Sequence, residues 1–166
     1  MFTLDGAALD MDGKQFTYEV PAPFGPNRGK AVLNITARPA ATVNSAYQAS
    51  VDKTIHTANV RDLVTKKNFD QSDDVDAYVT DSSNSKRWAQ KAAAETFYDH
   101  CIIEWSTTIQ NDGKDMEPTR ENYIALSLFE HPVIDVLFSE IRDDLRNFEK
   151  FSLDAVAEAD GEEEKN

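Results

Sequence analysis

The sequence predicts an α+β fold, in which a small N-terminal β-hairpin or partial sheet packs on a body of four or five helices. Three features favour this class: apolar alternation near the N-terminus, helical periodicity through most of the remaining chain, and an acidic final segment that can bury little. The 166 residues, 40% of them hydrophobic, suffice for one domain with an ordinary core. We expect a hairpin region over 1–40, a helical body over 41–153 in the same domain, and a disordered acidic tail over 154–166.

Two segments with alternating apolar residues, 16–20 and 33–37, define the hairpin. The prolines and glycines of 21–29, which lies between them, cannot continue a regular strand pair. The sequence therefore predicts two strands joined by a long, stiff loop.

The following forty residues carry weaker helical patterns. One helix is indicated over 43–51 and another over 60–64, each with apolar residues on one side. Polar, turn-rich segments at 70–76 and 81–85 predict exposed or mobile connections on either side of a short segment at 78–79.

A stronger helical pattern begins at Ser85, a good N-cap residue, and continues to about Trp105. The segment 110–114 then predicts a turn, because Asn, Asp and Gly accept left-handed backbone angles. Thr119 can cap a further helix, with Glu121 in its first turn at the positive end of the dipole.

The most regular helical pattern starts at Pro132, a residue that suits the first position of a helix. Apolar residues then recur at spacings of four and three, which places them in one stripe that either closes the core or faces a partner. The stripe consists of Ile134, Phe138, Ile141, Leu145 and Phe148.

The two tryptophans, Trp88 and Trp105, are further candidates for partner binding. The pattern places them 17 residues apart on one helix, where they are either core anchors or side chains that contact a partner. With the stripe, they complete the predicted set of partner-binding residues.

Composition restricts the classes of partner. The net charge of −13 disfavours direct nucleic-acid binding, because an acidic surface repels phosphate groups.

A single cysteine, Cys101, and an N-terminus without the layout of a secretory signal favour a cytoplasmic setting. No apolar run approaches the roughly 18 to 20 residues of a membrane span, so we expect no membrane role.

Reactive side chains show no arrangement typical of catalysis. His56, His100 and His131 lack a second ligand at metal-site spacing. His100 and Cys101 are adjacent, and neighbouring side chains on a helix point in different directions. The acidic run 73–76 is typical of solvated surface. We therefore predict a protein that is not an enzyme, with no catalytic residue, metal or cofactor; a site assembled only by folding stays open as an alternative.

The order of features between residues 97 and 148 resembles that of the tail assembly chaperones of long-tailed bacteriophages. The shared order is a helix ending in Ile103 to Trp105, a turn with Asp112 to Lys114, the segment 117–122, an apolar helix, a break at His131 and Pro132, and a final helix ending near Phe148. Such chaperones similarly begin with a short β-hairpin, here 16–20 and 30–37.

The resemblance implies a protein of the host cell cytoplasm that coats the long helical tape measure protein, keeps it soluble, helps to recruit the tail tube protein and is absent from the finished particle. The residues agree with this role, because amphipathic helices can cover apolar stripes while an acidic exterior prevents co-precipitation. Two alternatives stay open, a structural virion protein of the tail or head completion and an acidic inhibitor that mimics DNA. Homo-oligomerisation is open as well.

Overall fold

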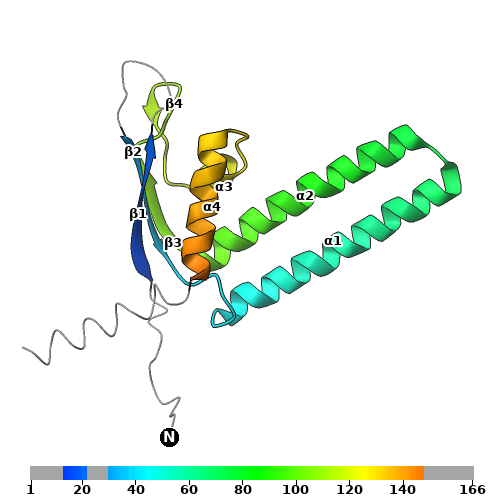
Figure 1. Ribbon diagram of the computed structural model, residues 1–166, viewed down its shortest axis with the longest axis horizontal. Helices are drawn as coiled ribbons and strands as arrows, with labels where there is room; N and C mark the ends of the chain where they lie inside the picture. The colour runs from blue at the N-terminus through cyan, green and yellow to red at the C-terminus, as the bar shows by residue number, and fades with distance from the viewer. Residues whose placement is uncertain (1–12, 22–29, 148–166) are drawn as a thin grey trace, which may run out of the picture.

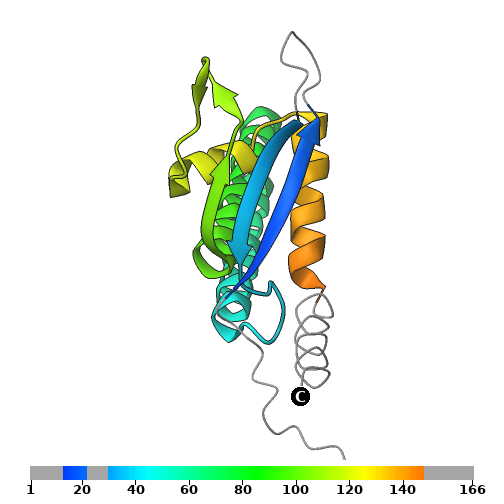
Figure 2. The same ribbon diagram turned by 90° about the vertical axis from the view of Figure 1, so that its left-hand side faces the viewer.

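The computed structural model describes residues 13–21 and 30–147, which form an α+β fold with helices on one face of a small sheet (Figures 1 and 2). Four helices lie within these described ranges. The predicted fold class is therefore confirmed, while the expected acidic tail at 154–166 lies outside the described residues.

The predicted hairpin is present as β1 (Lys14–Pro21) and β2 (Lys30–Ala37), which pair antiparallel along their full length. A third strand, β3 (Ile102–Thr107), pairs antiparallel with the other side of β2. Alternation places the apolar side chains of β2 on one face, where Leu33 and Ile35 are buried beneath the helices.

The helix expected to reach Trp105 ends earlier, at Cys101, because the chain enters β3 there. The pairing register shifts between Thr36 and Ala37, and this bulge lets both Ile102 and Trp105 point into the core. The helical spacing used for the prediction continued from Cys101 to Glu104, but Glu104 is an exposed strand residue, so the last step of that pattern was coincidental.

The region expected to hold short helices and loops is instead a helical hairpin. It comprises α1 (Ser45–Ser72) and α2 (Val75–Cys101), antiparallel and adjacent, and we call residues 45–101 the arm (Figure 1). Ser85 is a buried residue inside α2 and does not cap it. The loops predicted at 70–76 and 81–85 are replaced by helix, apart from the short link between α1 and α2.

This link consists of Asp73 and Asp74, and each has a local function. Asp73 ends α1 in the left-handed region with a φ of 51°. The side chain of Asp74 accepts a hydrogen bond from the backbone N–H of Ala77 at 3.0 Å and so caps α2. The acidic residues that suggested a loop are therefore capping residues.

Few apolar contacts hold the two helices of the arm together. Near its base, the hydroxyl groups of Ser50 and Thr96 lie 3.1 Å apart. Near its tip, the rings of Phe69 and Tyr78 pack with centroids 4.9 Å apart. Helix α1 has no buried residue. The arm thus consists of two long helices that shield each other little from solvent.

The short elements that follow β3 agree with the sequence prediction. Strands β4 (Gln110–Asn111) and β5 (Lys114–Asp115) flank a tight turn in which Asp112 and Gly113 both have positive φ. Helix α3 (Arg120–Ser127) then begins at the predicted cap, Thr119, whose side chain accepts a hydrogen bond from the N–H of Asn122.

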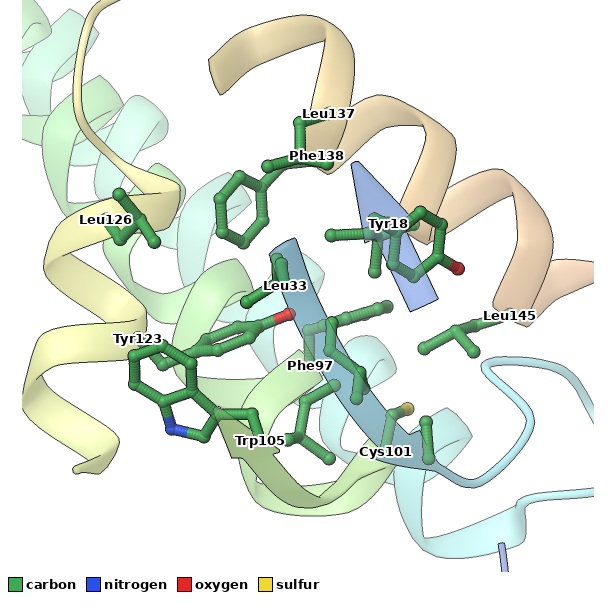
Figure 3. Close-up of a cluster of buried hydrophobic side chains, with 14 of the residues drawn as sticks. Tyr18, Leu33, Phe97, Cys101, Trp105, Tyr123, Leu126, Leu137, Phe138 and Leu145 are labelled. Atoms are coloured by element: carbon green, nitrogen blue, oxygen red, sulfur yellow. The ribbon is translucent and has the colours of Figure 1, made fainter. Parts of the chain in front are cut away.

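The core lies between the sheet and α4 (Pro132–Arg146), with α3 and the end of α2 at its sides (Figures 2 and 3). Tyr123 of α3 occupies its centre. The ring of Tyr123 makes edge contacts with Trp105 and Phe138, each at a centroid distance of 5.4 Å. The hydroxyl of Tyr18 on β1 donates to Asp144 on α4 at 3.0 Å, which adds a polar link to the apolar contact.

Candidate protein-binding site

The predicted apolar stripe on α4 belongs to the core. All four of its described side chains are at most 8% exposed in the isolated chain. Of the two roles considered for the stripe, these residues therefore close the core. These four residues are Ile134, Phe138, Ile141 and Leu145. Phe148 lies outside the described residues. These four side chains therefore hold α4 on the sheet and offer little surface to a partner.

The two tryptophans lie on different elements, contrary to the expectation of one shared helix. Trp105 is 3% exposed on β3, and its indole Nε1 has no hydrogen-bond partner within the described part of the chain. Trp88 is half-buried on α2 beneath the guanidinium of Arg61, which lies 4.9 Å from the ring centroid. Trp105 is thus a core residue, and Trp88 joins the two helices of the arm.

Six of the eleven exposed large apolar side chains among the described residues lie on the arm, where the sequence patterns did not place a binding surface. Val60, Leu63 and Val64 are 45%, 66% and 52% exposed, and their spacing of three and four places them on one side of α1. Val75 and Val79 form a second such pair on the first turns of α2. Grouped apolar side chains in solvent are typical of surfaces that bind another chain.

We call Val60, Leu63 and Val64 the α1 patch. The neighbouring residue Arg61 contacts α2, so the patch lies outside the seam between the two helices. The sequence pattern did indicate a helix at 60–64, but it could not tell which side would face α2. This candidate surface was therefore missed because its exposure depends on how the two helices pair.

Side chains capable of catalysis do not converge. Burial raises the pKa of the Cys101 thiol to about 12, so the group is protonated at neutral pH and a poor nucleophile. Asp73, Asp74 and Asp76 lie exposed at the tip of the arm, as the sequence predicted for solvated carboxylates. Within residues 13–21 and 30–147, no three His, Cys, Asp or Glu side chains are grouped as metal ligands.

We predict that Tyr123→Phe leaves the free energy of unfolding unchanged or raises it by up to about 1 kcal/mol. The hydroxyl of Tyr123 is buried without a hydrogen-bond partner in the described structure, so its removal ends a desolvation cost. Tyr18→Phe is the matched control and should cost about 1 kcal/mol, because it removes the bond to Asp144. Urea denaturation measures the free energy of unfolding of both variants. Equal losses of stability would show that the Tyr123 hydroxyl has a hydrogen-bond partner.

An ion pair between α2 and α3 fixes the position of α3 beside the arm. The guanidinium of Arg120 donates to both carboxylate oxygens of Asp99, at 2.6 and 2.8 Å. This hydrogen bonding lowers the pKa of Asp99. The two side chains are 38% and 43% exposed, so solvent screening limits the contribution of the pair to less than about 1 kcal/mol.

The Arg120–Asp99 pair predicts a small pH dependence of stability. The folded-state pKa of Asp99 lies below the ordinary value of about 3.9, so the contribution is fully present above that pH and is lost as pH falls through the lowered pKa. Asp99→Asn should therefore destabilise the protein by a few tenths of a kcal/mol at neutral pH. The difference from wild type in urea denaturation should shrink below about pH 4; a difference that grows there would contradict the assignment.

Comparison with known proteins finds no matching protein family, no similar curated protein and no similar solved structure. Among the described helices, each lacks the combination of length and apolar character that crossing a bilayer requires.

Proposed function

We propose that the protein is a non-catalytic chaperone that binds apolar helices of another protein, and that its client is the tape measure protein of a long-tailed phage. The observation that carries this proposal is the arm, because it exposes the apolar α1 patch although its own seam contains mostly polar contacts. A protein that used these helices only for its own core would bury the apolar side chains in the seam and expose the polar ones.

The length of the arm suits a helical client. Its two helices have 28 and 27 residues, which corresponds to about 40 Å of continuous helix. A client helix laid along the arm can therefore cover apolar side chains over several turns, as amphipathic helices do in other helix-binding proteins. The resemblance of 97–148 to tail assembly chaperones supports the choice of client.

The distribution of charge also supports the proposal. The arm contains seven Lys or Arg and nine Asp or Glu, whereas residues 102–147 contain four and ten. Residues 102–147 thus carry a larger acidic excess than the arm and can keep a complex soluble, while the nearly neutral arm does not repel a client of either sign.

Co-expression with the cognate tape measure protein tests the proposal. We expect the tape measure protein to be insoluble alone and to be recovered as a soluble complex with this chain, in the host cell cytoplasm. A tape measure protein whose solubility is unchanged, with no co-purification, would reject the proposal. Recovery of this chain in purified virions would instead support a structural role in the particle.

A further inference from the structure

A groove of about 360 Å³ lies at the elbow where the arm meets the body. Residues from α2, α3, α4 and the link between α3 and α4 line it, and Tyr47 from the first turn of α1 contributes to it. We call this feature the elbow groove. Asn44 fixes the elbow, since its amide donates to the backbone carbonyls of Pro39 and His100 at 3.0 and 2.9 Å.

The middle of the elbow groove is apolar. Phe97 of α2 and Phe138 of α4 line it and are nearly buried, while Leu128 at the end of α3 is 38% exposed. Ala93 and Ala94 on α2 lack long side chains, so another helix can approach closely there. The groove can therefore accept apolar side chains without any movement of the core.

The charged residues of the elbow groove are separated by sign. Glu130 and Asp135 lie at the N-terminal end of α4, and Arg142 and Arg146 lie two to three turns farther along the same helix. Asp135 and Arg146 are thus about 16 Å apart along the helix axis. The groove has an acidic end, an apolar middle and a basic end.

Three of these charges are available to a ligand. Within the described ranges, the side chains of Glu130, Asp135 and Arg142 form no hydrogen bond or ion pair. Burial raises the pKa of Tyr47, and a hydrogen bond with Arg146 opposes that rise. A ligand of complementary charge can therefore pair with both ends of the groove without breaking an existing ion pair.

We propose that the elbow groove binds one helix of a partner protein, antiparallel to α4, with a cationic side chain of that helix at Glu130 and Asp135 and a carboxylate at Arg142 and Arg146. The apolar side chains between these charges then contact Leu128 and Phe97. This inference rests on the proposed function, because the helix bound in the groove belongs to the proposed client.

The direction of the bound helix follows from its dipole. An antiparallel helix has its C-terminus at the acidic end of the groove, near the start of α4. Cations stabilise the C-terminus of a helix and carboxylates its N-terminus. A helix with Glu in its first turn and Lys in its last turn is therefore stabilised by its own charges in the orientation that the groove favours. A parallel helix would need the reverse distribution, which opposes its dipole.

Two synthetic peptides of about 18 residues test the proposal with the full-length protein. Both have Leu on one face; one has Glu in its first turn and Lys in its last, and in the other these residues are exchanged. Fluorescence anisotropy gives their Kd values. We expect the first peptide to bind about tenfold more tightly. Equal affinities, or no binding of either peptide, would overturn the proposal.

A charge-exchange variant provides the second measurement. The double variant Asp135→Lys, Arg142→Glu changes two exposed, unpaired side chains. Each end of the groove then carries one positive and one negative charge, so the variant should abolish the preference between the peptides. The matched control Asp143→Lys, Lys114→Glu exchanges the same charges at exposed positions outside the groove and should retain the wild-type preference. A preference that is unchanged in the first variant, or lost in the control, would overturn the assignment.

Failure of this inference can be separated from failure of the proposed function. A wild-type protein that co-purifies with the tape measure protein but does not discriminate between the peptides would retain the chaperone role and reject the groove. Peptide discrimination that the charge exchange abolishes, without co-purification of the tape measure protein, would retain the groove and reject the phage client.

Discussion

Replacing Phe138 by Asp is expected to unfold the protein at room temperature. The ring of Phe138 is 4% exposed and lies against Tyr123 in the centre of the core. Truncation of such a ring alone costs about 3 to 5 kcal/mol, and a carboxylate in the same place adds the cost of burying a charge. The sum is comparable to the total stability of a typical domain, about 5 to 15 kcal/mol. Loss of the helical circular dichroism signal measures the effect.

The control for this prediction is Phe138→Leu, which keeps an apolar side chain in place and should leave a folded protein of lower stability. A folded Phe138→Asp protein with native urea resistance would mean that Phe138 is not a core residue. It would then reopen the alternative in which the stripe on α4 faces a partner.

Replacing Leu63 and Val64 together by Asp is expected to abolish client binding and to leave the protein folded. Both side chains are more than half exposed, so the substitutions bury no charge in the free protein. Loss of two apolar contacts of about 2 kcal/mol each would weaken binding by on the order of a thousandfold. Isothermal titration with the client measures this loss, and circular dichroism verifies the fold.

The matched control is Gln15→Glu with Asn111→Asp, which adds the same two charges at exposed polar positions of β1 and β4, away from the arm. This variant should bind the client with an affinity within about tenfold of wild type, since only long-range charge effects remain. Equal losses in both variants would mean that charge, and not the α1 patch, determines binding.

Local signals predicted the elements that local chemistry determines. The hairpin strands, the Asp112-Gly113 turn, the cap at Thr119 and the start of α4 at Pro132 all lie where the sequence placed them. Each depends on backbone preferences or on a hydrogen bond within a few residues, so a single sequence contains enough information.

The arm could not be predicted in the same way because its helices are stabilised by their pairing. Serine and threonine hydroxyls in its seam, such as those of Ser50 and Thr96, give no apolar periodicity. The opposite error was made at β3, where Glu104 continued the helical spacing of α2 by coincidence although it is an exposed strand residue. The candidate binding surface was hidden for a related reason: exposure of Leu63 depends on which side of α1 meets α2.

The polar seam of the arm has a consequence for the lifetime of a complex. Helices that are joined by hydroxyl contacts and a few aromatic pairs open at a small cost in free energy, so amide protons toward the tip should exchange sooner than those of the sheet. Part of the energy gained on association is then consumed in ordering the two helices, which lowers net affinity and speeds dissociation. Such easy release suits the proposed chaperone role, in which the client is later transferred to other subunits.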